Sequence, residues 1–303
     1  MAHGADRPHR GTIFVEDAEL LDHQRFDGAQ HVLRLRAPET ARRALPGQFV
    51  HLSCDPRLPM RRPFSIMRAS AAEGWIDLLY KVVGGGTELL ATRARGETLS
   101  LLGPIGVPFV AHPQRPRPLL LGGGVGIPPM VFVAEVLAKA PRDAADPRWQ
   151  PFVVMGSEVP FPFKQRPSQF MVAGMPAGAT ACMPLLEDWG IPSRLTSKQG
   201  YAGCFDGFVT DLARAWLDAL DAAARAEVEV FACGPTPMLR AVAALAATYD
   251  LPCQISLEEH MACAVGGCAG CAVEVVTPAG KAMQRVCVDG PVFDARCVFP
   301  DAG

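Results

Sequence analysis

Four cysteines near the carboxyl end constrain this chain more than any other feature. Cys263, Cys268 and Cys271 follow the spacing C-x4-C-x2-C, and Cys287 follows further along the chain. This spacing is typical of plant-type [2Fe–2S] centres, in which three thiolates on one tight loop and a fourth from elsewhere surround two irons. The sequence therefore predicts a metal site at Cys263, Cys268, Cys271 and Cys287 that holds a [2Fe–2S] cluster.

The residues around these cysteines suit such a loop. Gly266, Gly267 and Gly270 are expected to supply backbone angles with positive φ and to let N–H groups approach the sulfurs. Two apolar runs within 272–286 flank a turn at 278–281, which predicts a hairpin. The hairpin would return the fourth cysteine to the loop.

Two alternatives stay open for this cluster of cysteines. The first is a structural zinc site or a set of unpaired thiols, although zinc knuckles favour paired C-x2-C units and the chain has one. The second concerns Cys297, which is a rival for the fourth ligand. Because Cys297 lies past the hairpin, we expect it to be a free thiol.

Composition narrows the class of protein. The chain has 303 residues, enough for two or three domains, and its 49% hydrophobic and 20% charged residues exclude wholesale disorder. Lys and Arg number 29 against 31 Asp and Glu, so no basic excess indicates nucleic acid binding.

Neither a membrane span nor an export signal is expected. The most apolar stretch, 118–138, contains four glycines, internal prolines and Glu135, which argues against a membrane helix. No apolar block follows the charged residues among the first ten, so no signal peptide is predicted. Ten cysteines without such a signal do not indicate a disulfide framework, and we expect a cytoplasmic protein.

The fold class predicted is a β-barrel FAD domain, an α/β nucleotide-binding domain and a small C-terminal [2Fe–2S] domain. Residues 11–115 show short apolar runs separated by Pro and Gly, which favours a small barrel. A proline-rich stretch, 112–118, is a candidate linker. The predicted strands of the first domain are Thr12–Val15, His31–Leu35, Phe49–Leu52 and Trp75–Val83.

Residues 119–252 alternate strands and helices, which predicts a parallel α/β sheet. No order is predicted for the irregular stretch 157–200, and residues 253–303 form the expected cluster domain. The predicted strands are 119–121, 152–155 and 228–232, and the predicted helices are 128–139, 207–218 and 236–248.

Two loops of the α/β domain are candidates for a nucleotide site. Gly122, Gly123, Gly124, Val125 and Gly126 join a strand to a helix, where N–H groups and the helix dipole favour a pyrophosphate. The G-x-G-x-x-G pattern fails because Ile127 occupies its last position, so a mere tight turn stays open. Cys233, Gly234 and Pro235 end another strand, where α/β sheets bind ligands.

The barrel has its own candidate residues. Arg62, Pro63, Phe64 and Ser65 place a guanidinium, a ring and a hydroxyl on one extended segment, and Gly84–Thr87 offers donors for a phosphate. Taken alone, these residues favour an ordinary surface strand and turn; the case for a cofactor site comes from their combination with the other motifs.

Taken in order, the motifs resemble one family. The chain is similar, over about residues 11–295, to the electron transfer subunit of NAD-dependent dihydroorotate dehydrogenase, and more broadly to ferredoxin–NADP reductases. The segments that carry the resemblance are RPFS at 62–65, LLYKVVGGGT at 78–87, LGPIG at 102–106, LGGGVGIPPM at 121–130, CGPTPM at 233–238, the cysteine motif and RVCVDGPVF at 285–293.

The resemblance implies three cofactors and a partner. It implies an NAD site at the two α/β loops, a [2Fe–2S] cluster on the four cysteines, and a partner subunit that carries FMN and oxidises dihydroorotate to orotate in pyrimidine synthesis. Two such pairs would form a heterotetramer. The implied FAD site consists of Arg62, Pro63, Phe64, Ser65, Leu79, Tyr80, Lys81, Gly86 and Thr87.

The resemblance also implies a mechanism. Electrons from the partner's FMN would pass singly through the cluster to FAD, and FAD would give a hydride to NAD⁺. No catalytic side chain is expected. Cys233 is expected to pack near the nicotinamide ring, because it ends a strand that faces the glycine loop.

Departures from the family pattern leave alternatives open. The usual acidic segment before Gly207 is replaced by Thr196–Tyr201, which includes Lys198, so NADP stays open beside NAD. His260 stands where Arg is usual, and 157–195 match poorly. The chain could instead be a similar FAD and [2Fe–2S] reductase with another redox partner, or a non-enzymatic metal-binding or redox-sensing protein.

Overall fold

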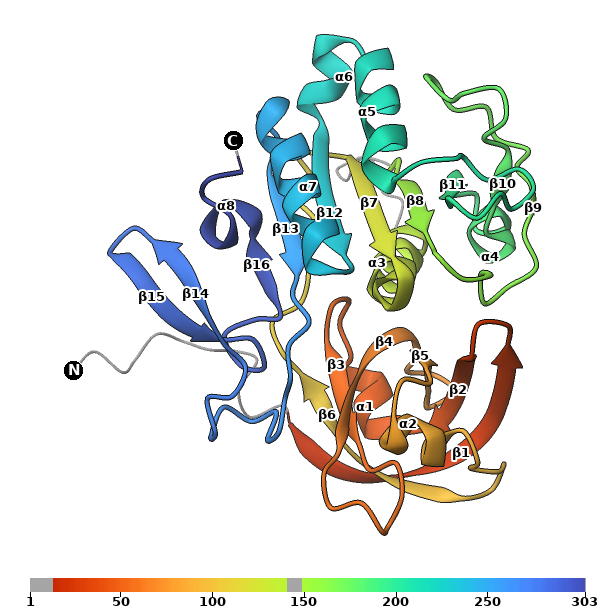
Figure 1. Cartoon of the computed structure of the whole chain (residues 1–303), viewed down its shortest axis with the longest axis vertical. Helices are drawn as coiled ribbons and strands as arrows, with labels where there is room; N and C mark the ends of the chain where they lie inside the picture. Colours follow the sequence, from red (N-terminus) through yellow and green to blue (C-terminus); the bar gives the residue numbers. More distant parts are fainter. Residues whose placement is uncertain (1–12, 141–148, 303) are drawn as a thin grey trace.

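The computed structural model describes residues 13–140 and 149–302, which form a barrel, a twisted sheet and a projecting hairpin (Figure 1). Residues 11 and 12 of the predicted barrel, the first ten residues and residue 303 lie outside this range. None of the described helices has both the length and the apolar character needed to cross a bilayer.

The first domain is a closed antiparallel barrel with strand order β1-β2-β5-β4-β3-β6, as predicted. Alternating side chains fill its core, including Leu33, Leu35, Val50 and Leu52. Its strands are β1 (Phe14–Phe26), β2 (Gln30–Arg36), β3 (Phe49–Leu52), β4 (Arg62–Ser70), β5 (Trp75–Lys81) and β6 (Thr98–Ile105), and its helices are α1 (Pro38–Arg43) and α2 (Gly85–Leu90).

Two barrel strands differ from the expectation. The strand expected to end at Val15 continues as β1 to Phe26, and β6 was not predicted as a strand. Both carry polar residues on their outer faces, which broke up the apolar runs used to recognise strands. Barrel closure pairs β1 with β6, and this pairing satisfies their backbone groups.

The second domain is a six-stranded sheet of order β11-β8-β7-β12-β13-β16, parallel except for β16. Its strands are β7 (Arg117–Gly123), β8 (Phe152–Gly156), β11 (Ser193–Thr196), β12 (Val228–Cys233), β13 (Cys253–Ser256) and β16 (Val292–Asp294). Its longer helices are α3 (Ile127–Lys139), α5 (Val209–Ala219) and α7 (Thr236–Thr248). The shorter helical elements are η1 (Gly124–Gly126), α4 (Pro184–Asp188), α6 (Ala222–Ala226) and α8 (Ala295–Val298).

Both faces of this sheet are covered, which explains its continuous apolar strands. Leu119 and Leu121 of β7 pack with α5 and α7, whereas Leu120 packs with α3 on the other face. The predicted helices agree with α3, α5 and α7 to within two residues. The stretch 157–200, left without order, contains α4, β11 and a small pair of strands, β9 (Arg166–Pro167) and β10 (Ala181–Cys182).

The cysteine segment is inserted between two strands of the sheet. β13 and β16 lie within 253–303 yet belong to the second domain's sheet, so the sheet extends across the predicted boundary at 253. Between them, β14 (Ala272–Thr277) and β15 (Gly280–Arg285) form the predicted hairpin, with Thr277 opposite Gly280. In Figure 1 the cysteine loop descends beside the barrel.

Two contacts hold the barrel against the sheet domain. Glu135 of α3, 1% exposed, accepts from Arg68 of β4 at 2.8 Å and from Lys139 at 2.9 Å. At the opposite end, Gln30 donates to the carbonyl of Pro160 at 2.6 Å. Apolar packing joins the domains as well, since Phe132 of α3 belongs to the barrel core.

Candidate functional site

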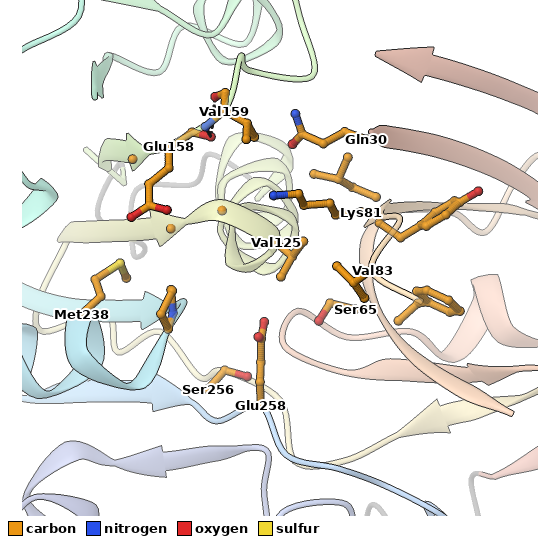
Figure 2. Close-up of a pocket in the computed structure, with 18 of the residues that line it drawn as sticks. Gln30, Ser65, Lys81, Val83, Val125, Glu158, Val159, Met238, Ser256 and Glu258 are labelled. Atoms are coloured by element: carbon orange, nitrogen blue, oxygen red, sulfur yellow. Dashed lines mark hydrogen bonds between the residues drawn. The ribbon is translucent and has the colours of Figure 1, made fainter. Parts of the chain in front are cut away.

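A cavity of about 1410 Å³ lies between the barrel and the carboxyl ends of the parallel strands (Figure 2). Its volume exceeds that of a typical pocket for one small ligand, ~300–1000 Å³. The barrel contributes β4, β5 and the loop before α2, while the sheet contributes the segments that follow β7, β8, β11, β12 and β13.

All nine residues expected to contact FAD line this cavity. Arg62 of the barrel lies against the segment 84–87, because a Cβ added to Gly86 would be 2.9 Å from the Arg62 Nε. The Phe64 and Tyr80 rings meet edge to face with centroids 5.6 Å apart. The hydroxyl of Thr87 accepts from the N–H of Val83 at 2.9 Å and so organises the loop. The barrel side of the cavity thus offers a ligand a guanidinium group, backbone hydrogen-bond donors and the flat apolar faces of two rings.

Two histidines that the sequence did not predict as site residues, His23 and His31, contact Tyr80. The His31 and Tyr80 rings stack with centroids 5.1 Å apart, and His23 Nε2 lies 3.0 Å from His31 Nδ1 and 3.2 Å from the Tyr80 hydroxyl. Burial, followed by the charges of His23 and Arg25, lowers the pKa of His31. Burial raises the pKa of Tyr80. Burial therefore favours the neutral forms of the stacked His31 and Tyr80 rings.

The glycine loop divides into residues that face the cavity and residues that do not. Gly123, Gly124, Val125 and Pro235 line it. Gly122, Gly126, Cys233 and Gly234 are absent from the described lining and lie behind it. A Cβ on Gly126 would be 2.3 Å from the carbonyl oxygen of Cys233, so the two loops touch through their backbones. Gly126 permits this close approach.

Cys233 and Glu258 lie close enough to interact at the sheet edge. Cys233 is fully buried, and burial together with the Glu258 charge raises its thiol pKa, while a hydrogen bond with Ser256 opposes the shift. Figure 2 shows Glu258 reaching from the end of β13 toward Val125 and Ser65. Glu258 is open to the cavity, yet the surrounding protein buries it enough to raise its pKa. A neutral thiol and a carboxyl group with a raised pKa thus lie beside the glycine loop.

Some residues that line the cavity carry no recognisable motif, so the sequence did not predict them. They include Ser157, Glu158 and Val159 after β8. The rule that ligands bind outside the carboxyl ends of parallel strands would have found them once the strand order was known. Lys198 and His260, noted as departures, also line the cavity, and Lys198 Nζ lies 4.0 Å above the Phe208 ring.

The four cysteines form two contacting pairs. The N–H of Cys268 donates to Cys263 Sγ at 3.4 Å, and burial of Cys263 is outweighed by N–H and thiol donors, which lower its pKa to about 6. The N–H of Cys287 donates to Cys271 Sγ at 3.5 Å, and burial and the Cys271 thiol raise the Cys287 pKa to about 12. Thiols in two pairs fit a two-iron core, in which each iron takes two thiolates.

A single-ion site fits this arrangement less well. Across residues 13–140 and 149–302, no three His, Cys, Asp or Glu side chains are placed to hold one metal ion together. The structural zinc alternative needs four ligands around one ion. The rival ligand Cys297 lies in α8, beyond β16, and burial raises its pKa.

The loop reaches its shape differently from the expectation. Of the three glycines expected to have positive φ, Gly266 does so at 77°, whereas Ala264 and Ala269 adopt 56° in place of Gly267 and Gly270. The expected N–H contacts to sulfur are present. Arg285 at the end of the hairpin links the hairpin to the cysteine loop, because its guanidinium donates to the carbonyl of Gly266 at 2.8 Å.

Comparison with known proteins agrees with this site. A family model described as the iron-sulfur cluster binding domain of dihydroorotate dehydrogenase B matches residues 258–299. A protein of Desulforamulus reducens named dihydroorotate dehydrogenase B (NAD(+)), electron transfer subunit, is 31% identical over 283 residues, 92% of this chain and 96% of that protein. A protein of the same name from Bacillus caldolyticus is 35% identical over 258 residues, 82% of this chain and 85% of that protein.

Solved structures share the fold. The structure of an NADH-dependent reduced ferredoxin–NADP oxidoreductase has a TM-score of 0.71 at 24% identity and covers 93% of this chain and 89% of that one. The ferredoxin reductase of carbazole 1,9a-dioxygenase has a TM-score of 0.59 at 20% identity and covers 79% of this chain and 67% of that one.

Proposed function

The chain belongs to the family of dihydroorotate dehydrogenase B electron transfer subunits, and on this basis we propose how its residues carry electrons between a catalytic subunit and NAD. The catalytic partner would hold FMN and oxidise dihydroorotate to orotate in pyrimidine synthesis. Electrons would then cross this chain through a [2Fe–2S] centre and FAD to NAD⁺.

One observation carries the proposal. The barrel residues expected to contact FAD, the glycine loop and the segment 256–261 line the same cavity. That segment ends two residues before Cys263, the first predicted cluster ligand. A flavin, a nicotinamide and the cysteine loop can therefore approach one another within one continuous site.

The barrel would bind and orient FAD. Arg62 and the loop 84–87 suit its diphosphate, because a guanidinium and clustered N–H groups both bind phosphate oxygens. Phe64 and Tyr80 offer flat apolar surface to a ring system, and the stacked His31 keeps Tyr80 in place. When bound, FAD supplies the exchange between paired and single electrons that no side chain provides.

The sheet would bind NAD, with Gly123–Val125 and Pro235 against the dinucleotide. Because Cys233 and Glu258 adjoin this loop, we propose that they shape the place where the nicotinamide ring meets the flavin. Lys198, two residues after the end of β11, leaves NADP open as a second nicotinamide substrate. Cys263 with Cys268, and Cys271 with Cys287, would each hold one iron.

Two finer points belong to the proposal. We propose a heterotetramer of two catalytic and two electron transfer subunits, as the family resemblance implies. We also propose a cytoplasmic location, which is supported by ten cysteines that form no disulfide bond among the described residues.

The deciding experiment is anaerobic purification followed by a visible spectrum and mixing with an FMN-containing dihydroorotate dehydrogenase catalytic subunit. We expect flavin and iron–sulfur absorption, bleaching by NADH, and orotate-linked NADH formation in the mixture. Bleaching without orotate-linked turnover would indicate a reductase with another partner. Colourless protein would contradict the proposal as a whole.

Replacing Arg62 by Ala is expected to weaken FAD binding by about 10- to 100-fold, the loss typical of a charge-assisted hydrogen bond. Flavin fluorescence titration of the apoprotein measures this affinity. Arg57→Ala is the matched control, because Arg57 is exposed and pairs with Asp55. Equal affinity of the Arg62 variant and this control would remove Arg62 from the FAD site.

Replacing Cys233 by Ala is expected to slow hydride transfer about tenfold, because small displacements of a reacting ring carry large rate penalties. Stopped-flow bleaching of the flavin by NADH measures the step. Cys253→Ala is the control, since Cys253 is also a buried thiol of the same sheet but lies at the start of β13. An unchanged rate in the Cys233 variant would show that the thiol has no such role.

A further inference from the structure

Tyr80 extends from the core of the barrel to the cavity between the two domains. It is 2% exposed, belongs to the buried apolar cluster of the barrel and lines the cavity. His31 of β2 lies directly opposite Tyr80 in the pairing of β2 with β5, and the two rings stack with centroids 5.1 Å apart. The orientation of the Tyr80 ring therefore depends on its neighbours inside the barrel.

His23 of β1 joins these two rings to a third segment. Its Nε2 lies 3.0 Å from His31 Nδ1 and 3.2 Å from the Tyr80 hydroxyl oxygen. Its Nδ1 lies 2.9 Å from the carbonyl oxygen of Arg93, which follows α2. The Arg93 guanidinium pairs with Glu97 at 2.9 Å. His23 thus links Tyr80 to the chain that leaves α2.

These contacts assign the proton positions on His23. The Arg93 carbonyl can only accept a hydrogen bond, so His23 Nδ1 carries a proton and donates it. In the neutral ring, Nε2 then holds a lone pair and accepts. Within residues 13–140 and 149–302 this nitrogen is the one hydrogen-bond partner of the Tyr80 hydroxyl, which therefore donates to it. His31 does not need the same acceptor, since it can carry its proton on its own Nε2.

We infer that His23 is a positioning residue that accepts a hydrogen bond from the Tyr80 hydroxyl and so holds the Tyr80 ring in its orientation at the cavity. His31 contacts the face of the ring, while His23 holds its hydroxyl end. The consequence for a bound flavin rests on the proposed function, whereas the bond between His23 and Tyr80 does not.

Release of FAD from the full chain, purified anaerobically with its cofactors, tests this role. We expect His23→Leu to release FAD about tenfold faster, because it leaves a buried hydroxyl without its acceptor. His23→Gln can place an amide oxygen near the position of Nε2, so FAD release should stay close to the wild-type rate. The visible circular dichroism of the bound flavin should change in His23→Leu and should not change in His23→Gln.

Tyr80→Phe separates the hydrogen bond from any other effect of His23. This substitution keeps the ring and removes the hydroxyl, so adding His23→Leu should have little further effect on FAD release. Thermal unfolding gives a second readout that needs no flavin. His23→Leu is expected to lower Tm by several degrees when Tyr80 is present, and to leave Tm nearly unchanged in the Tyr80→Phe background.

Gln24→Ala is the matched control, because Gln24 is the next residue of β1, is exposed and bonds Asp22. It should leave FAD release and Tm unchanged. If His23→Leu does not fold, His23→Asn takes its place. Asn can still donate to the Arg93 carbonyl but is too short to reach the Tyr80 hydroxyl, so His23→Asn should release FAD faster than His23→Gln.

Wild-type FAD release and Tm in His23→Leu would overturn the inference, as would an equal loss with and without the Tyr80 hydroxyl. Colourless wild-type protein would contradict the proposed function instead, and the thermal comparison would still decide whether the bond holds Tyr80. The two failures are therefore distinguishable.

Discussion

Replacing Cys287 by Ala is expected to abolish the two-iron centre, whereas replacing Cys297 by Ala is expected to leave it intact. Cys287 is fully buried and its N–H donates to Cys271 Sγ, so no solvent donor can take its place. Cys297 lies in α8 beyond the hairpin. Iron content and the electron paramagnetic resonance signal of the reduced protein measure the outcome.

The flavin should survive the loss of the cluster. The residues expected to bind FAD come from β4, β5 and the first turn of α2, and they line the cavity, whereas Cys287 is not among the lining residues. NADH should therefore still bleach the flavin of Cys287→Ala while orotate-linked turnover disappears. A centre that persists in Cys287→Ala and is lost in Cys297→Ala would assign the fourth ligand to Cys297 instead.

Replacing Gly126 by Ala is expected to destabilise the fold and to weaken NADH binding together. The added methyl would lie 2.3 Å from the carbonyl oxygen of Cys233 and 2.5 Å from the nitrogen of Gly234. Both are backbone atoms, so β7 and β12 must separate at their carboxyl ends. Overpacking of this kind costs about 1–3 kcal/mol, and we expect Tm to fall by several degrees.

Thermal unfolding and NADH titration check this prediction. Gly178→Ala is the control, because a Cβ there meets nothing within 4 Å and its φ is not in the left-handed range. The control should keep both Tm and NADH affinity. Normal stability with lost NADH binding in Gly126→Ala would instead place Gly126 in direct contact with the dinucleotide.

The cysteine motif illustrates what local sequence can predict. The spacing brought three of the four predicted ligands onto one loop, and the turn between two apolar runs predicted the hairpin β14–β15 that returns the fourth. These features depend on residues close together in the chain, so their signals are local. The fold class followed similarly, since the barrel and the alternating strands and helices each leave a periodic pattern.

The cavity shows which features a local sequence pattern does not predict. The barrel side was predicted residue by residue through a family resemblance, but Glu258, Ser157 and the His23–His31 pair carried no motif. Parallel neighbours such as β8 and β11 are separated by a long irregular stretch, and their order decides which loops meet. Register and strand order are long-range properties, which a single sequence encodes only weakly.

The sequence by itself therefore determined the kind of chemistry this protein supports: four thiols at cluster spacing, a glycine loop and a flavin-binding motif on a barrel. Only the tertiary structure decided how these parts are joined. It placed Gly126 against the Cys233 backbone rather than in the cavity lining, and it set Glu258 close to Cys233. The physical reason is that each of these contacts joins segments far apart in the chain, and only packing brings such segments together.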